Sequence, residues 1–136
     1  VAVADVDDDG FPDLAITGYQ GLQFWKNQGD GTFRDSTTDS GLDADELWST
    51  SAAWGDLNAD GLLDLYVAHY VDWPPQNHPS CPNSKHERDV CPPRQFSPLK
   101  DEAFLGNGDG TFRSGGVELG LSDDGKGLGV LIADID

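Results

Sequence analysis

The sequence predicts an all-β protein made of four-stranded antiparallel units. Three observations support this class: an acidic loop that occurs twice in full, a Gly-Asp-Gly-Thr-Phe-Arg turn that also occurs twice, and short apolar stretches between them. These stretches are rich in β-branched and aromatic residues, which favour strands, and the 17 glycines favour frequent turns. Self-similarity of this kind is typical of proteins that stack one supersecondary unit on the next.

Each unit contains the same elements in the same order. An apolar strand leads into the acidic loop at residues 1–4, 51–55 and 130–133. A second strand leaves the loop at residues 14–17 and 65–71, and a third strand follows at residues 22–26 and 103–105. An Asp-Gly turn then leads to a short fourth strand that begins Thr-Phe-Arg. Because Asp-Gly tolerates positive φ at both central positions, we expect type I′ turns there.

Four strands in about 50 residues correspond to one blade of a β-propeller. We place one blade at residues 1–50, a second at 51–129, and the start of a third, truncated blade at 130–136. The second unit is longer because a proline- and cysteine-rich insertion occupies about residues 73–100. About two and a half blades leave strand edges unpaired, so we interpret the chain as a piece of a larger ring. The remaining blades, or another copy of the chain, would cover those edges.

The acidic loop reads D-x-D-x-D-G-x-x-D, a pattern that predicts a calcium site. Calcium takes six to eight oxygen ligands at about 2.3–2.6 Å, and side chains at positions 1, 3 and 5 surround one point. The glycine at position 6 permits the sharp turn, and position 7 supplies a backbone carbonyl. The expected ligands are Asp5, Asp7, Asp9, the Phe11 carbonyl and Asp13 in loop one, Asp56, Asn58, Asp60, the Leu62 carbonyl and Asp64 in loop two, and Asp134 and Asp136 in an incomplete third site.

The residues that follow each loop distinguish this pattern from an EF-hand. Position 12, where an EF-hand has a bidentate Glu, is Ile16 in loop one and Val67 in loop two. The acid comes at position 9 instead and a strand follows, so we expect a strand–loop–strand site for Ca²⁺. The alternative is an Asp/Gly-rich turn without metal. It is disfavoured because carboxylates about 4–5 Å apart repel one another by a few kcal/mol per pair.

The charge of the chain narrows the range of partners. There are 25 acidic and 8 basic residues, for a net charge of −17. Without a basic patch the chain does not fit a nucleic-acid binder, and its charge repels anionic membranes. No apolar run approaches the roughly 18 residues of a membrane span, so we expect no membrane insertion.

The acidic loops and the Asn-x-Gly-Asp-Gly-Thr-Phe stretches resemble the FG-GAP/VCBS repeats of integrin-α-type β-propellers. More narrowly, residues 25–35, 40–42, 53–56 and 64–67 are similar to the cartilage-acidic-protein-like, ASPIC/UnbV-associated group. The resemblance implies a calcium-binding propeller, usually of seven blades, that is secreted, on the cell surface or periplasmic. It also implies a surface used for adhesion or for binding a protein or glycan ligand. Asn58 departs from the acidic pattern and is expected to lower the affinity of loop two.

The insertion contains both cysteines, and we predict that Cys81 and Cys91 form a disulfide. Calcium loops indicate an oxidising compartment outside the cytosol, where closure of this short loop would stabilise by roughly 2.5–3 kcal/mol. The alternative is zinc, because His78-x2-Cys81-x4-His86-x4-Cys91 resembles the spacing of a zinc knuckle. A third hypothesis is that the insertion contacts a ligand, since long loops are often functional.

The sequence contains no recognisable set of nucleophile, base and orienting group, and no phosphate loop. We therefore favour a binding module with structural calcium over an enzyme. The second hypothesis is a propeller from a calcium-dependent carbohydrate-active enzyme or lectin, with Trp48 and Trp73 as a platform for sugars. Trp25 and Trp54 lie in predicted strands and are expected to pack between blades. His69 alternates with Leu65 and Val67 and is expected in the core.

Overall fold

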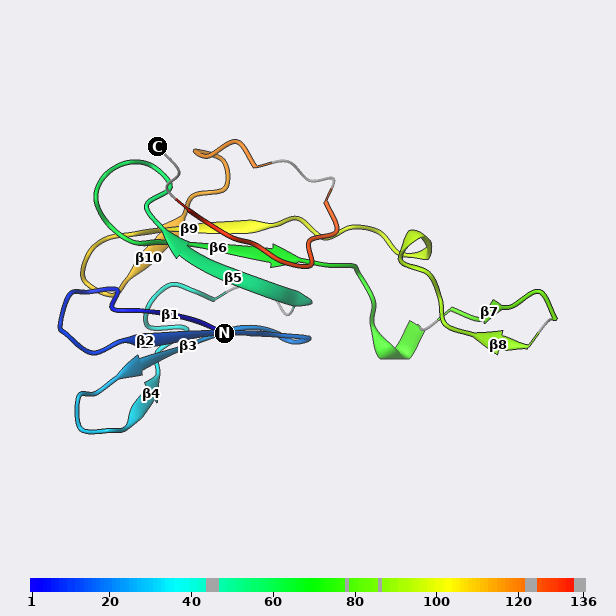
Figure 1. The fold of residues 1–136 in the computed structure, drawn as a ribbon, viewed down its shortest axis with the longest axis horizontal. Helices are drawn as coiled ribbons and strands as arrows, with labels where there is room; N and C mark the ends of the chain where they lie inside the picture. Colours follow the sequence, from blue (N-terminus) through cyan, green and yellow to red (C-terminus); the bar gives the residue numbers. More distant parts are fainter. Residues whose placement is uncertain (44–46, 78, 86, 122–124, 134–136) are drawn as a thin grey trace.

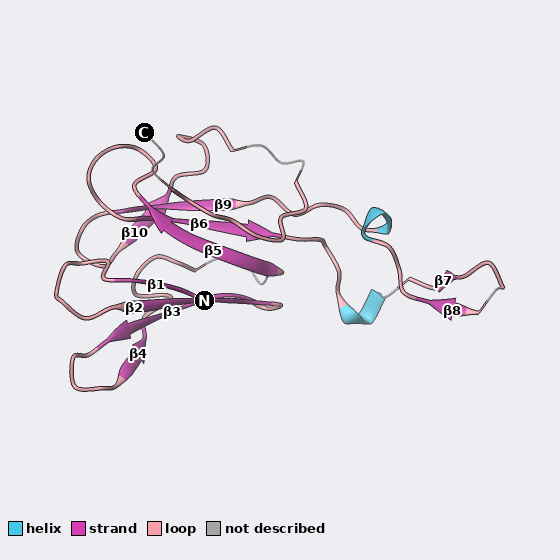
Figure 2. Cartoon of the chain, in the orientation of Figure 1, coloured by secondary structure: helices cyan, strands magenta, loops and turns pink. Residues whose placement is uncertain are grey.

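In the computed structural model, two four-stranded antiparallel sheets lie next to each other and a long insertion projects from one end (Figure 1). The structure describes residues 1–43, 47–77, 79–85, 87–121 and 125–133. Helical structure within these residues is confined to two 3-10 turns, Pro75–Asn77 and Pro93–Gln95 (Figure 2). The predicted all-β class is confirmed, and the antiparallel sheets are consistent with propeller blades.

The first sheet contains β1 (Ala2–Ala4), β2 (Asp13–Gly18), β3 (Gly21–Asn27) and β4 (Phe33–Asp35) in sequence order. Ala4 pairs with Asp13, so loop one connects the paired ends of β1 and β2. Gly18 pairs with Gly21 at the tight connection between β2 and β3. The first acidic loop therefore lies at the opposite end of β2 from this connection.

The second sheet repeats the arrangement with β5 (Ser49–Gly55), β6 (Asp64–His69), β9 (Glu102–Gly106) and β10 (Phe112–Ser114). Gly55 pairs with Asp64, so loop two connects β5 to β6. The insertion leaves the sheet after β6 and returns before β9. It contains a small hairpin of β7 (Cys81–Pro82) and β8 (Arg88–Asp89), which Figure 1 shows far from both sheets.

The core lies between the two sheets. Alternate residues of the inner strands face it, because side chains of a strand alternate between the two faces of a sheet. Phe24 of β3 is fully buried and contacts the rings of Trp54 and Phe112, with centroids 6.2 and 6.0 Å away. Neither sheet buries this apolar face alone, so the stacking of two units stabilises the fold. Trp54 packs between the sheets as expected, whereas Trp25 lies outside this buried cluster.

The turns between the third and fourth strands differ from the type I′ turns that we expected. In the first unit φ is positive at Gly29 (74°) and Gly31 (89°) but not at Asp30 between them. Asp30 Oδ1 accepts hydrogen bonds from the N–H and hydroxyl of Thr32, at 3.0 and 2.6 Å. These bonds hold the aspartate in an Asx turn, which replaces the expected hairpin geometry. The second unit repeats them between Asp109 and Thr111.

The strand expected at residues 130–133 does not form. This stretch runs along β5, where the Val130 N–H donates to the hydroxyl of Ser51 at 3.4 Å. Ile132 packs on Gly55, whose missing side chain makes room for it. No backbone ladder with β5 is present in the described residues, so the stretch covers the sheet through side chains instead of extending it.

Candidate metal centre

Both acidic loops have the same hydrogen-bond pattern, and the aspartate at position 1 organises it. Asp5 Oδ1 accepts the N–H of Asp9 at 3.1 Å, and Asp5 Oδ2 accepts the N–H of Gly10 at 2.8 Å. These bonds bend the chain back over its own first residue. The same two bonds recur in loop two, where Asp56 accepts from Asp60 at 3.1 Å and from Gly61 at 2.9 Å.

Two residues of each loop have the left-handed conformation. Gly10 and Gly61, at position 6, have φ of 89° and 86°, as the sequence predicts. Asp8 and Ala59, at position 4, have φ of 56° and 61°, which the sequence did not predict. Aspartate tolerates this region better than most residues because its side chain can form local hydrogen bonds. Alanine has no such hydrogen bond, so its backbone is strained there.

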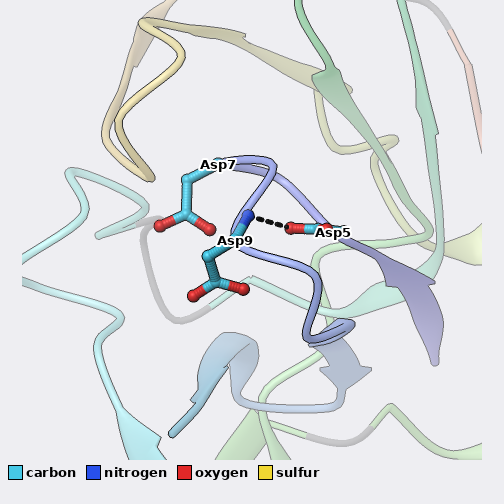
Figure 3. A group of neighbouring side chains, drawn as sticks. All are labelled: Asp5, Asp7 and Asp9. Atoms are coloured by element: carbon cyan, nitrogen blue, oxygen red, sulfur yellow. Dashed lines mark hydrogen bonds between the residues drawn. The ribbon is translucent and has the colours of Figure 1, made fainter. Parts of the chain in front are cut away.

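Loop one brings three predicted ligands together. One carboxylate oxygen from each of Asp5, Asp7 and Asp9 lies within 4.8 Å of the others (Figure 3). Asp5 and Asp7 are half-buried and Asp9 is exposed. Asp7 Oδ1 is buried and accepts no hydrogen bond from the described residues. A buried carboxylate oxygen without a partner is costly, so this atom is suited to accept a cation or a hydrogen-bond donor.

Lys26 of β3 supplies a positive charge to the same group. Its ammonium forms an ion pair with Asp7 Oδ2 and lies 3.5 Å from Asp9 Oδ2. Burial lowers the pKa of Lys26, but the hydrogen bond to Asp7 and the charges of Asp7, Asp13 and Asp9 outweigh it, so the pKa is raised. The sequence did not predict this contact. The aligned position of the second unit is Leu105, so loop two has no equivalent lysine.

The aspartate at position 9 is fully buried in both loops and connects the loop to the third strand. Asp64 Oδ1 accepts the N–H of Gly106 at 2.9 Å, and its Oδ2 accepts the N–H of Leu57 at 2.8 Å. Asp13 Oδ1 likewise accepts the N–H of Asn27 at 2.8 Å. The carboxylate at position 9 therefore attaches the loop to the third strand through hydrogen bonds that need no metal ion.

Asp13 stands apart from the group formed by Asp5, Asp7 and Asp9. Its Oδ2 accepts no hydrogen bond of normal length and angle. Burial raises the pKa of the Asp13 carboxyl, against the opposing effects of the Asn27 and Val6 backbone and the Lys26 charge. Asp13 thus offers a second buried oxygen without a full partner in the same loop.

Loop two is built differently at its centre because Asn58 replaces an acid. Asn58 Nδ2 donates to Asp60 Oδ2 at 2.9 Å, and Asn58 Oδ1 accepts the N–H of Asp60 at 3.0 Å. Hydrogen bonds from the Leu62 backbone and the Asn58 side chain lower the pKa of the Asp60 carboxyl. Among the described residues, loop two forms no group of three clustered acids.

The residues at position 7, Phe11 and Leu62, donate their N–H groups to Asp9 and Asp60, each at 2.9 Å. Their side chains lie over Gly29 and Gly108, where an added Cβ would come within 2.8 Å of the Phe11 ring and 3.1 Å of Leu62. The third-site residues Asp134 and Asp136 lie outside the described residues.

Cys81 and Cys91 form the predicted disulfide, with Cα atoms 5.2 Å apart. The alternative zinc site is therefore wrong, because a zinc ligand must be a thiolate and both sulfur atoms are in the disulfide. His78 and His86, the other two residues of that alternative, lie outside the described residues.

The comparison with protein families identifies residues 5–67 as an FG-GAP-like repeat. The matched segment begins at the first residue of loop one and includes all of loop two. Residues 5–67 are thus an FG-GAP-type repeat, as the resemblance of the loops indicated. No curated protein matches the chain.

Proposed function

From this FG-GAP-type repeat we propose that the chain is a calcium-stabilised β-propeller segment of an extracytosolic protein that binds other molecules through its surface. The observation that carries the proposal is the group of Asp5, Asp7 and Asp9, in which Asp7 Oδ1 is buried and accepts no hydrogen bond from the described residues. We extend the proposal to the cartilage-acidic-protein-like group, on the resemblance of residues 25–35 and 53–56.

The donor set fits calcium. Carboxylate oxygens and backbone carbonyls are the ligands that this hard cation prefers. In loop one, Asp5, Asp7, Asp9, the Phe11 carbonyl and Asp13 would hold it. In loop two, Asp56, Asn58, Asp60, the Leu62 carbonyl and Asp64 would do so, with one negative charge fewer. Bound calcium would neutralise carboxylates that otherwise repel one another within a chain of net charge −17.

Lys26 would compete with the cation in loop one. Its ammonium pairs with Asp7 Oδ2 and lies 3.5 Å from Asp9 Oδ2, so these two oxygens would have to leave Lys26 before they could bind a metal ion, whereas Asp7 Oδ1 would not. This competition lowers the affinity of loop one, and a modest affinity suits an extracellular module, where dissociation constants of about 10⁻⁴–10⁻³ M are common.

The disulfide and the FG-GAP repeat both fit an extracellular protein, since disulfides persist in oxidising compartments. The described residues contain no helix with the length and apolar character needed to cross a membrane.

Calcium titration followed by thermal unfolding tests the proposal. Binding to the folded state alone should raise Tm, by about 2.7 kcal/mol of stability at one hundred times the dissociation constant. Identical melting curves in millimolar calcium and in excess chelator would refute calcium binding. Magnesium serves as the control cation, because it dehydrates reluctantly and demands octahedral geometry.

A matched pair of variants tests the assignment of the ligands. Asp9→Asn and Asp8→Asn each remove one negative charge from loop one, but only Asp9 is a proposed ligand. Asp9→Asn should weaken calcium binding at this site by about tenfold or more, and Asp8→Asn by much less. Equal losses by calorimetry would show that overall charge, and not ligation, sets the affinity. Lys26→Met should tighten the same site.

A further inference from the structure

A pocket of about 650 Å³ opens at the end of the second sheet that lies opposite loop two. Trp48 immediately precedes β5 and Tyr70 immediately follows β6, whereas loop two connects the other ends of these strands. The insertion forms the remaining walls, with Trp73, Arg88 and Asp89 among the lining residues. The pocket therefore lies between the end of the second sheet and the insertion that projects from it.

We propose that this pocket binds a neutral saccharide. Its volume is within the range of about 300–1,000 Å³ that small-ligand sites occupy. Aromatic rings provide flat apolar walls for the C–H faces of a pyranose ring, and polar groups at the walls can form hydrogen bonds with its hydroxyls. The inference is independent of the calcium proposal, because no proposed calcium ligand lines the pocket.

The aromatic wall is held in place by ring-to-ring contacts. Trp48 packs edge-on against Tyr70, with centroids 5.3 Å apart, and lies 5.7 Å from Trp73. Tyr19 of the β2–β3 connection contacts both tryptophans, at 5.5 and 5.4 Å, and its hydroxyl donates to the Trp73 carbonyl at 2.9 Å. A ligand thus meets rings whose orientation is already fixed, which reduces the entropy lost on binding.

The polar groups at the pocket favour hydroxyl groups as their partners. Within the described residues, the indole N–H of Trp48 and the hydroxyl of Tyr70 form no hydrogen bond. Arg88 and Asp89 of β8 are exposed and line the pocket, where they provide a donor and an acceptor. Sugar hydroxyls both donate and accept, so they can pair with donors and acceptors alike.

The charges and ring contacts disfavour other ligands. Arg88 and Asp89 contribute no net charge to the pocket, and the net charge of −17 disfavours anionic glycans. A quaternary ammonium ion needs rings that surround a space, but Trp48 packs directly against both Tyr70 and Trp73. The disulfide fixes the far wall, since Cys91 lines the pocket and Cys81 pairs with Asp89 in the β7–β8 hairpin.

Titration of the full chain with chitotriose, cellotriose, maltotriose and mannobiose, followed by tryptophan fluorescence and calorimetry, tests the proposal. At least one of these neutral saccharides should bind with a stoichiometry of one per chain. Trp48→Ala and Trp73→Ala should each weaken binding by about tenfold or more, as loss of an anchoring tryptophan usually does. Trp25→Ala is the matched control outside the pocket and should leave binding unchanged.

Asp89→Asn and Arg88→Gln provide a test that does not disturb the packing, because both side chains are exposed. Each should weaken saccharide binding while leaving Tm unchanged. Absence of binding by all four saccharides at about 10 mM, the concentration at which even millimolar sites fill, would overturn the proposal. Binding that survives all four pocket substitutions would also overturn it. So would binding of tetramethylammonium or a proline-rich peptide in the pocket in place of a saccharide.

Discussion

Substitution of Asp64 by asparagine separates the structural role of position 9 from its proposed role in calcium binding. Asp64 is fully buried, and each of its carboxylate oxygens accepts one backbone N–H, from Gly106 and from Leu57. An asparagine at this position keeps one oxygen but directs an amide NH₂ at the second N–H. The variant therefore loses one hydrogen bond and leaves one buried backbone donor without a partner.

The two losses set the size of the effect. A hydrogen bond to a charged group contributes about 1.5–3 kcal/mol, and a buried donor left without a partner costs about 1–3 kcal/mol. The two costs partly count the same lost interaction, so they do not add in full. We therefore expect Asp64→Asn to lower the free energy of unfolding by about 3 kcal/mol. For a chain of this size that corresponds to a fall in Tm of roughly 10 °C.

The measurement is thermal or urea unfolding in excess chelator, so that calcium contributes nothing to the difference. Asp60→Asn is the control, because Asp60 is an exposed member of the same loop. It should change the free energy of unfolding by well under half as much. If Asp64→Asn unfolds like the parent chain in chelator and loses only its calcium response, Asp64 is a ligand without a structural role and the reasoning fails.

Three further predictions concern single features of the fold. Ala59 has φ of 61°, so Ala59→Gly should stabilise by about 1 kcal/mol in urea unfolding, whereas Ala52→Gly within β5 should destabilise; a loss of stability in Ala59→Gly would contradict the strain. Burial lowers the pKa of His69, against the opposing effects of the Lys100 backbone and the Asp101 charge. Below about pH 6.5 the unfolded chain therefore binds a proton that the folded chain does not. The stability of the folded chain should decrease as the pH is lowered through this range. His69→Gln should flatten this part of the pH profile, and an unchanged profile would assign the dependence to other groups. Reduction of the disulfide should release the insertion, so trypsin cleavage after Lys85 and Arg88 should accelerate by up to about a hundredfold, while cleavage after Arg34 stays constant.

Much of the fold could be predicted because its signals are local. The alternation of apolar residues in β2 and β6 places Ala15, Leu65 and Val67 on a buried face, and the repeat of that pattern predicts two similar sheets. The glycine at position 6 of each loop predicts the turn that lets Asp5 accept N–H groups from residues further along the loop. Cys81 and Cys91 are close enough in sequence for a short disulfide-bonded hairpin.

The errors arise where a side chain outweighs a backbone preference or where a partner is missing. Asp30 would allow a type I′ turn, but the two hydrogen bonds from Thr32 hold it in another conformation. Residues 130–133 have the composition of a strand, yet a strand also needs a backbone partner, and this stretch reaches β5 mainly through Ser51 and Ile132. Amino-acid composition predicts neither the hydrogen bonds of a turn side chain nor the presence of a backbone partner for a strand.

The sequence by itself determined the all-β class, the two acidic loops, the FG-GAP-type repeat and the paired cysteines, because each depends on residues that are close together in the chain. Only the tertiary structure showed that Lys26 of β3 reaches Asp7 and Asp9, and that Asp64 links loop two to the end of β9. The aromatic pocket was also visible only in the tertiary structure, because Trp48, next to β5, and Arg88, in the insertion, line it together. These contacts join residues far apart in sequence, and the packing of strands, which no local pattern encodes, brings them together.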